Sequence, residues 1–437
     1  MECISIHTGQ TGIQWGLSCW DLFSAEHCLS PEGKIRLSDH IFSTSSLRDF
    51  SPFYRETEDG LFKPRALFLD CDDNVLEDPM YGSKLRRVDS PQKVLGTSNC
   101  ASIFGQGLGH NGDAVLDKSL EAVRRLMEEC ESPQGLIWYH SLGGGTGSGF
   151  TTLLARGIAR EYPELKMHEF SLLPGAELTC ATTDVYNSLL GLHNSLDMMG
   201  CSYLFDSDVL YKTCFNKLHV NNPNHSVLNT ILARVVADVT ATLRFPSIVN
   251  ATMEDIEFNL LPIQRMPFPV VCLQPLLHRN AECHDEHFKD LVMSCFERGN
   301  QVLNCSPKED KIIRSCLVLR GFIDMEEVRD GLNALKTDKE FKFVTSFSKT
   351  HTTCLLNSKL VDFADNIVSV PRIQVCSLTN SVSISGIFKE LTRKFDMMFQ
   401  QKAFLHWYYS EGMEEDDFNN ARDEMETLLV KYQNLEK

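Results

Sequence analysis

Short apolar runs alternate with longer stretches of helical periodicity over the first half of the chain. Residues 3–7, 66–69 and 136–139 are the apolar runs, and each predicts a strand because it is short and followed by glycine or acidic residues. The first and third runs lead through glycines into segments whose apolar residues lie three and four positions apart, as in a helix. Strand–loop–helix units of this kind predict an α/β fold with a doubly wound sheet.

The second half of the chain contains further predicted elements. A wide apolar stripe over residues 227–245 predicts a buried helix between two domains, with Asn224 or Ser226 as its cap. Short alternating strands and helices from about 262 to 379 predict a separate α/β domain. Two helical segments close the chain, with a break at residues 410–412 between them. The predicted inward positions of the last helix are Phe418, Met425, Leu428, Leu429 and Tyr432.

The segment 143–149, which reads Gly-Gly-Gly-Thr-Gly-Ser-Gly, is the most informative part of the sequence. A strand, a glycine loop and a helix N-terminus together present backbone N–H groups to phosphates, and Thr146 and Ser148 add hydroxyl donors. No Gly-Lys-Ser/Thr follows, so the segment is not a Walker loop, and its spacing misses G-x-G-x-x-G. A flexible surface loop is the alternative, but such a loop needs neither a strand nor a helix at its ends.

A second glycine turn and an acidic cluster follow the other two predicted strands. Residues 9–12 come directly after the first strand, and the acidic cluster 70–73 comes directly after the second. Because ligands bind at the carboxyl ends of the strands in a doubly wound sheet, we expect both segments to lie near the bound ligand. The polar stretch 36–62 predicts a long surface loop.

Charge and cysteine content narrow the class of protein. The 437 residues include 42 Lys and Arg and 59 Asp and Glu, a formal charge of −17, which argues against nucleic acid or an anionic membrane as the main partner. No apolar run approaches the ~20 residues of a membrane span. The sixteen cysteines form no C-x-x-C pair and no secretory segment opens the chain, so we expect reduced thiols in a soluble cytosolic protein.

Motifs along nearly the whole chain resemble those of the tubulin family, and of its α type most closely. The glycine segment alone indicates the wider superfamily of tubulins and bacterial division proteins, and the opening and closing motifs narrow the resemblance to eukaryotic tubulin. The stretch 344–383 also has the length of the α-type version, which carries an insertion relative to the β type. The further motifs are ECISIH at 2–7, GQ-x-G-x-Q at 9–14, PRA at 64–66, YNS at 186–188, ATLRF at 241–245, KAFLHWY at 402–408 and EGMEE at 411–415.

This resemblance implies a tubulin-like fold of three parts. They are a GTP-binding domain over 1–206, an α/β intermediate domain over 207–382, and a C-terminal helical hairpin over 383–437. The core helix, at about 225–245, falls at the start of the second part.

The resemblance also implies a site for GTP and Mg²⁺. Gln10 falls near the phosphates and the magnesium, and Ser141, Gly145 and Thr146 fall where the family holds phosphate oxygens. Asn229 falls on an asparagine that hydrogen-bonds guanine. From its position in the helix alone, Asn229 would instead be interpreted as a capping or solvated amide.

Several implied site residues depart from the family pattern. Asp72 replaces a magnesium-side glutamate, Cys180 replaces a threonine near the ribose, and Ser207 replaces a second guanine-reading asparagine. Asp255 replaces the catalytic glutamate of the α type, which orients the attacking water on the nucleotide of the next subunit, and Glu254 lies beside it. Other departures are Asn99 for an aspartate, Ser102 for an asparagine and His225 for the tyrosine that stacks on the base.

These residues raise three candidate functions. The preferred one is a divergent α-type tubulin that binds GTP and magnesium, pairs with β-type tubulin and builds microtubules of the cytoplasmic cytoskeleton. A non-hydrolysing relative, acting as a specialised or regulatory subunit, is the alternative, because aspartate is one methylene shorter than glutamate and an error of about 1 Å can cost about 100-fold in rate. The third function is a dinucleotide-binding oxidoreductase, and the mismatch between the glycine segment and the G-x-G-x-x-G motif argues against it.

The last helix suggests a further class of partner. Its exposed positions are rich in carboxylates, which usually indicates a solvated face. Because the sequence ends at Lys437 without a long acidic tail, we expect motors and microtubule-associated proteins to bind this helix through their basic residues. The carboxylates that define the acidic helix face are Glu414, Glu415, Asp416, Asp417, Glu424 and Glu426.

Overall fold

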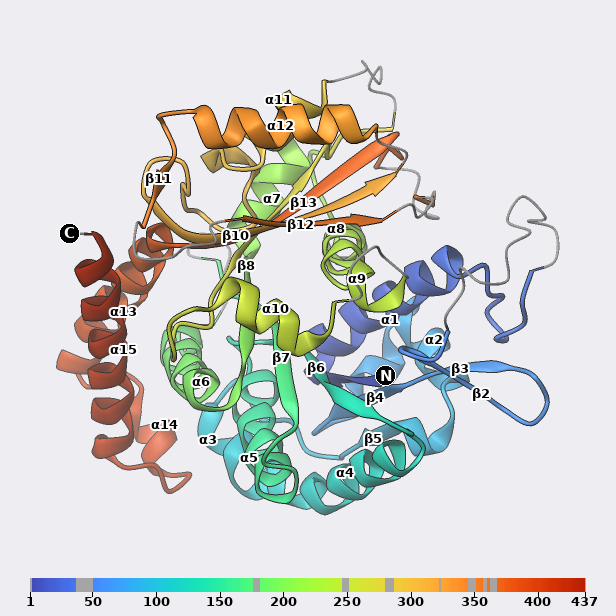
Figure 1. Cartoon of the computed structure of the whole chain (residues 1–437). Coiled ribbons are helices and arrows are strands. Elements are labelled where there is room, and N and C mark those ends of the chain that lie inside the picture. The colour runs from blue at the N-terminus through green and yellow to red at the C-terminus, as the bar shows by residue number, and fades with distance from the viewer. Residues whose placement is uncertain are drawn as a thin grey trace.

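The computed structural model describes residues 2–36, 50–175, 181–245, 251–279, 287–321, 324–344, 351–356, 360–361 and 368–436. The described residues form two large β-sheets on either side of a long central helix, with a pair of helices from the C-terminus along one flank (Figure 1). No helix within the described residues is both long and apolar enough to cross a membrane.

The first sheet has six parallel strands in the order β5-β4-β1-β6-β7-β8. From β1 the chain passes to β4 and β5 on one side, and then crosses to β6 on the other side of β1. The order therefore reverses between β1 and β6, and the carboxyl ends of strands at such a switch point form a ligand crevice. The strands are β1 (Glu2–Thr8), β4 (Ala66–Asp70), β5 (Lys93–Leu95), β6 (Pro133–Ser141), β7 (Lys166–Leu173) and β8 (Cys201–Asp206).

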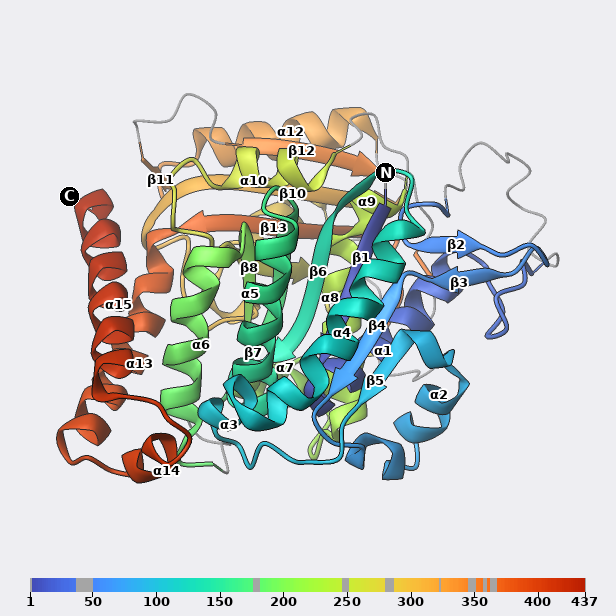
Figure 2. The ribbon, with the colours of Figure 1, turned by 90° about the horizontal axis from the view of Figure 1, so that it is seen from below.

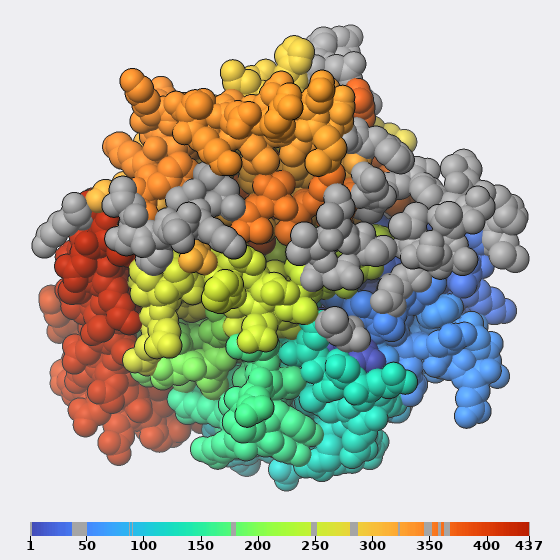
Figure 3. All heavy atoms as spheres, viewed as in Figure 1, coloured from blue at the N-terminus to red at the C-terminus, as the bar shows by residue number. Residues whose placement is uncertain are grey.

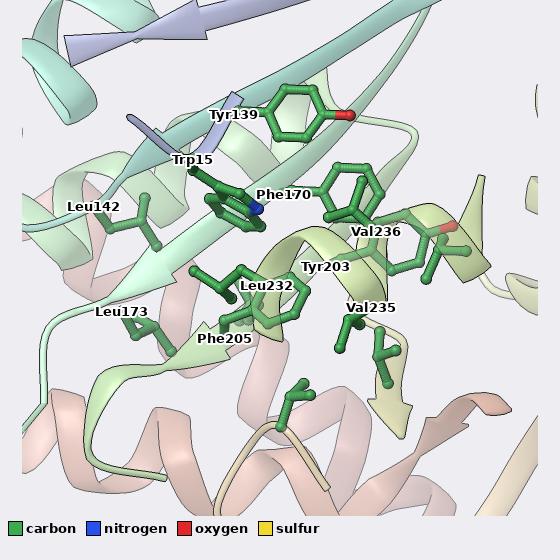
Figure 4. Packing of buried hydrophobic residues seen from close by; sticks show 14 of the residues in the cluster. Trp15, Tyr139, Leu142, Phe170, Leu173, Tyr203, Phe205, Leu232, Val235 and Val236 are labelled. Carbon is green, nitrogen blue, oxygen red and sulfur yellow. The ribbon is translucent and has the colours of Figure 1, made fainter. Parts of the chain in front are cut away.

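Alternation along these strands divides the core into two layers. Ile4, Ile6 and Trp138 point to the layer that α4 (His110–Glu128) and α5 (Thr151–Glu161) cover. The intervening positions point to the opposite layer, which holds α1 (Gly9–Glu26) and α8 (His225–Val239). In that layer Trp15 packs edge-on against Tyr139 and Phe205, beside Leu232 and Val236 of α8 (Figure 4).

The predicted buried helix is α8, followed after Thr240 by the short α9 (Ala241–Arg244). Asn224 is its cap, because Asn224 Oδ1 accepts a hydrogen bond from the backbone N–H of Val227 over 3.0 Å. Every residue from Val227 to Val239 is buried, as expected of a helix that lies between two sheets.

The second sheet contains five strands. β9 (Val270–Gln274) and β10 (Lys311–Gly321) pair antiparallel with β13 (Ile373–Ser381), while β11 (Lys342–Phe343) and β12 (His351–Leu356) run parallel to β10. One face packs on α8. The other face packs on α11 (Phe288–Ser294) and α12 (Met325–Thr337).

Four buried charges join α1, α8, α9 and the second sheet. The Arg320 guanidinium on β10 contacts Glu26 at 2.8 Å and Asp238 at 2.7 Å, and Arg244 contacts the second oxygen of Glu26 at 2.7 Å. All four side chains are at most 3% exposed, so each charge depends on the others for solvation.

The described part of the predicted surface loop 36–62 is not entirely loop. Its last residues form an antiparallel hairpin of β2 (Tyr54–Glu56) and β3 (Phe62–Pro64). Strands of three residues are too short for their periodicity to be detected, which is why the prediction missed them. The described residues of this half also include the short helices α2 (Tyr81–Arg87), α3 (Phe104–Leu108) and α7 (Ser207–Asn216).

The C-terminal hairpin consists of α13 (Ser385–Gln400) and α15 (Glu415–Glu436), with α14 (Leu405–Tyr409) in the connection. Both long helices lie along α6 (Asp184–Met198) (Figure 2). Gly412, at the predicted break, has a φ of +83°, and the predicted inward residues Phe418, Met425, Leu428, Leu429 and Tyr432 are buried. The hairpin prediction is therefore confirmed, whereas the domain boundaries at 206 and 382 stay predictions.

Candidate functional site at the switch point

The glycine loop 143–149 lies at the carboxyl end of β6, where a π-helical turn, Thr146–Phe150, leads into α5. A side chain has no room at several positions of the loop, of which Gly145 and Gly147 are examples. A Cβ atom on Gly145 would lie 2.7 Å from the carbonyl oxygens of Cys100 and Ile103, and one on Gly147 would lie 2.4 Å from that of Ser141. A Cβ on Gly144 would meet nothing within 4 Å. One side of the loop is thus closely packed, and Gly144 borders open space where a ligand can approach the backbone.

The first glycine turn touches this loop. Gly9 has a φ of +74°, and a Cβ there would lie 3.4 Å from the backbone nitrogen of Gly147 and 3.6 Å from Thr146 Cβ. Gln10 follows as an exposed residue in the first turn of α1. The fold therefore brings Gln10, Gly145 and Thr146 to one place, beside the N-terminus of α1. Ser141 lies at the base of the loop, where its Oγ accepts a hydrogen bond from Gly143 N over 3.3 Å.

The acidic cluster reaches the same loop from β4. Asp70 is 3% exposed, and its Oδ1 accepts a hydrogen bond from Cys71 N over 2.8 Å. Burial and, to a smaller extent, the nearby Asp72 carboxylate raise the pKa of Asp70 to about 7, against the opposing effect of hydrogen bonds from the backbone and from Thr146. Asp70 therefore lies beside the central threonine of the loop, with Asp72 near Asp70. Asp72 accepts hydrogen bonds from both the backbone and the side chain of Asn74.

Asn187 on α6 fixes the loops around the site. Its Nδ2 donates to the carbonyl oxygens of Ser102 at 2.7 Å and Gly143 at 2.6 Å, and its Oδ1 accepts from Phe104 N at 3.0 Å and Tyr408 Oη at 2.7 Å. This fully buried side chain uses all its hydrogen-bonding capacity to join two loops to α14. Its motif was noticed in the sequence, but this role was not predicted.

A further carboxylate borders the loop. Asp184 lies in the first turn of α6, and a Cβ atom added to Gly143 would be 3.1 Å from its Oδ1. Burial raises the pKa of Asp184 to about 6. The sequence carried no signal for this placement, because Asp184 lies 41 positions from Gly143 along the chain.

The predicted base-reading residues within the described part of the chain lie on α7 and α8. Asn229 is 6% exposed, and its Nδ2 donates to Tyr81 Oη over 3.0 Å. Its interpretation as a cap or a solvated amide is wrong, since Asn224 caps α8 and Asn229 is buried. Ser207 Oγ donates to the carbonyl oxygen of Leu173 over 3.0 Å, and His225 is exposed at the start of α8. Cys180 lies outside the described residues, and Asn99 and Ser102 are exposed in the loop before α3.

Asp255 lies at the opposite edge of the sheet from all these residues. It belongs to the first turn of α10 (Met253–Leu260), which packs on the amino end of β6, since Met253 N donates to Gln134 Oε1 over 3.4 Å. The nine-residue β6 spans about 30 Å between that edge and the glycine loop. Figure 2 shows α10 at the starts of the strands and α3 and α14 near their ends, and Figure 3 shows the α10 segment at the surface. Asp255 and Glu254 are both exposed.

The doubly wound sheet, the paired glycine turns and the flanking carboxylates define a nucleotide-binding protein. Residues 2–215 match the GTPase domain of the Tubulin/FtsZ family, and residues 264–393 match the tubulin C-terminal domain. The chain is also 33% identical over 437 residues to the Tubulin alpha-2 chain of Caenorhabditis elegans, which covers 99% of this chain and 96% of that relative. The chain therefore belongs to the tubulin family, as a divergent member of its α type. It is a GTP-binding subunit of the cytoskeleton.

Proposed function

We propose that the chain holds GTP and Mg²⁺ at the switch point, pairs with a β-type tubulin and enters cytoplasmic microtubules. The observation that carries this proposal is the position of Asp255 about 30 Å from the glycine loop of its own chain. A carboxylate so placed can act only on a nucleotide held by another subunit. Head-to-tail stacking, in which the α10 edge of one subunit meets the nucleotide edge of the next, satisfies this requirement and produces a filament.

The residues proposed for the switch point would supply the groups that bind a nucleoside triphosphate. In our proposal Gln10, Ser141, Gly145 and Thr146 hold phosphate oxygens, and the N-terminus of α1 adds a positive field. Asn229 reads the guanine base, with Ser207 and Cys180 on the remaining base and ribose positions.

Asp72 is the proposed magnesium ligand of the site, and Asp70 beside it contributes a second carboxylate. Mg²⁺ is bound through one or two carboxylates together with phosphate oxygens and water. The buried carboxyl of Asp70, whose pKa burial raises to about 7, fits a site where a divalent cation would compensate its charge. The bound cation would neutralise charge on the phosphates.

Asp255 is the proposed catalytic residue, and the attacking water that it would orient lies in the nucleotide site of the partner. An exposed carboxylate on α10 can orient a water molecule toward the γ-phosphate of the neighbouring nucleotide. The GTP held by this chain would be covered by its β-type partner and kept intact. An isolated chain therefore binds GTP and hydrolyses it very slowly.

The acidic helix face is the proposed docking site for motors and microtubule-associated proteins. Glu414, Glu415, Asp416 and Asp417 are exposed near the start of α15. Glu424 is less available than the sequence predicts, because it contacts His193 and Arg265 at 2.5 Å and is 25% exposed. Basic partners would therefore bind mainly at the start of the helix, with affinity that falls as salt rises.

Co-purification with a β-type tubulin tests this proposal. The full-length chain, co-expressed with that partner, should carry GTP in its own site and release phosphate only when the complex polymerises. An Asp255→Ala complex should form and retain the GTP of this chain, while its polymer-stimulated phosphate release falls. A complex without bound GTP, or phosphate release that is independent of polymer, would contradict the proposal.

A further inference from the structure

Tyr81 Oη is part of a chain of hydrogen bonds that ends at a backbone carbonyl. Asn229 Nδ2 lies 3.0 Å from Tyr81 Oη, and Tyr81 Oη lies 3.4 Å from Ser18 Oγ. Ser18 Oγ in turn donates to the carbonyl oxygen of Gln14 over 3.1 Å. Tyr81 is 3% exposed and Ser18 is 5% exposed, so the chain is protected from solvent.

The carbonyl at the end fixes the direction of every bond in this chain. A carbonyl oxygen can only accept, so the Ser18 hydroxyl hydrogen is committed to Gln14. Ser18 Oγ is then an acceptor for the Tyr81 hydroxyl, and Tyr81 Oη is an acceptor for Asn229. The NH₂ group of Asn229 therefore faces Tyr81, and its carbonyl oxygen Oδ1 faces away from Tyr81.

A neighbouring amide is held with the same polarity. Gln14 Nε2 donates to Asp78 Oδ2 over 3.3 Å, and an ionised carboxylate can only accept. The other oxygen of Asp78 accepts from the backbone N–H groups of Met80 and Tyr81, both over 2.9 Å. Asp78 thus anchors the start of α2 against α1 and sets the position from which Tyr81 reaches Asn229.

We propose that Tyr81 and Ser18 are positioning residues for purine selectivity, which hold Asn229 with its acceptor oxygen Oδ1, rather than its NH₂ group, toward the base. This inference rests on the proposed role of Asn229 at the guanine. Guanine presents N1–H and 2-amino donors along one edge, whereas adenine presents the lone pair of N1 there. With Oδ1 of Asn229 fixed toward the base, guanine can donate a hydrogen bond to it, whereas adenine would place a second acceptor against it. Mismatched buried polar groups of this kind are the strongest basis for discrimination between ligands.

Removal of the tyrosine hydroxyl should release the amide of Asn229. In Tyr81→Phe the ring still fills its place, but Asn229 can rotate and offer Nδ2 to adenine. The GTP-to-ATP binding ratio should therefore fall roughly three- to tenfold, the size of one lost neutral hydrogen bond. Ser18→Ala should lower the ratio in the same direction, although Ser18 does not touch Asn229, because the Tyr81 hydroxyl is then free to donate to Asn229 Oδ1.

The measurement is the ratio of GTP to ATP that the full-length chain retains from an equimolar mixture, with the same β-type partner in every sample. A ratio is unaffected by any fraction of unfolded protein. Tyr54→Phe is the matched control, because Tyr54 is 2% exposed and its hydroxyl contacts Ser24 on α1 at 3.2 Å, away from Asn229. Its GTP-to-ATP ratio should equal that of the unmodified chain.

A second-site change separates positioning from simple packing. Asn229→Asp places acceptors on both sides of the side chain, so the double variant Tyr81→Phe with Asn229→Asp should regain the selectivity that Tyr81→Phe loses. If the unmodified chain retains no GTP, the proposed function fails. If it retains GTP and both Tyr81→Phe and Ser18→Ala leave the ratio unchanged, only this inference is overturned. Should Tyr81→Phe fail to fold, Ser18→Ala alone decides between these outcomes.

Discussion

Thr252 and Asp255 cap the start of α10 reciprocally. The backbone N–H of Thr252 donates to Asp255 Oδ2 over 2.9 Å, and the N–H of Asp255 donates to Thr252 Oγ1 over 3.1 Å. This arrangement is a capping box, in which Glu is the more usual residue at the third position of the helix. The proposed catalytic carboxylate therefore also stabilises the helix that carries it.

Replacement of Asp255 should affect stability and hydrolysis separately. Asp255→Ala should lower the free energy of unfolding by about 1 kcal/mol through loss of the cap, and should slow polymer-stimulated phosphate release. Asp255→Glu should keep the cap and raise phosphate release, because the longer side chain reaches further toward the neighbouring nucleotide. Denaturant unfolding and phosphate release measure the two effects. Glu254→Ala is the control; if it abolishes hydrolysis while Asp255→Ala does not, the neighbouring carboxylate has the role.

The hydroxyl of Thr146 should contribute to nucleotide retention. Thr146→Val keeps the shape of the side chain and should reduce GTP affinity about 10- to 100-fold, since a hydrogen bond to a charged group contributes about 1.5–3 kcal/mol. Thr152→Val is a matched control in the first turn of α5, where the hydroxyl donates to the carbonyl oxygen of Ser148 over 2.9 Å. Equal retention of GTP by the two variants, measured after gel filtration, would contradict the phosphate-binding role of the loop.

Asn187 should couple the loops of the site to the C-terminal helices. Asn187→Ala leaves the buried carbonyl group of Gly143 and the buried backbone N–H of Phe104 without this partner, and each unpaired buried group costs about 1–3 kcal/mol. We expect lower stability and faster loss of GTP. Asn194→Ala, on the same helix, removes the oxygen that accepts a hydrogen bond from Arg156 and should lower stability without affecting GTP retention. Thermal unfolding and nucleotide content distinguish the two variants, and unchanged GTP retention in Asn187→Ala would refute the coupling.

The buried charges between the two sheets should be sensitive to the loss of any one member. Glu26→Gln leaves two guanidinium groups, Arg244 and Arg320, facing a single remaining carboxylate, Asp238. The free energy of unfolding should fall by about 3–5 kcal/mol, as for other broken buried pairs. Asp89→Asn, which breaks the exposed contact with Lys63, should cost at most about 1 kcal/mol. Comparable costs in urea unfolding would show that the network contributes no more than a surface pair.

Asp70 should make the stability of the nucleotide-free chain fall as pH rises. Its folded-state pKa of about 7 lies above the ordinary value of 3.8, so the folded state binds more protons between these pH values. The contribution of the neutral Asp70 carboxyl to the free energy of unfolding is therefore fully present below about pH 4. It is lost as the pH approaches and passes 7. Asp70→Asn should remove this loss and so gain stability relative to the unmodified chain at pH 8. Urea unfolding at pH 5 and pH 8, with magnesium chelated, measures the difference, and parallel pH profiles would exclude this role for Asp70.

The sequence alone determined the elements whose signals are local. The strands β1, β4 and β6, the central helix α8 and the inward face of α15 follow from periodicity, because burial of one face imposes a repeat of two or 3.6 residues. The glycine segment indicated phosphate binding for the same reason, since backbone approach requires glycine at those positions. Local patterns could not choose between Asn224 and Ser226 as the cap, and they missed the three-residue strands β2 and β3.

Only the tertiary structure decided which of these elements meet. The strand order brings Gly9 beside Thr146 across 137 positions of sequence, and carries Asp255 to the far edge of the same sheet. The packing of α1, α2 and α8 buries Asn229 and orients its amide through Tyr81, where the helical position alone indicated a cap or a solvated amide. Such contacts depend on the direction and order of strands and on helix packing, which are properties of the whole fold and leave no periodic signal in the residues themselves.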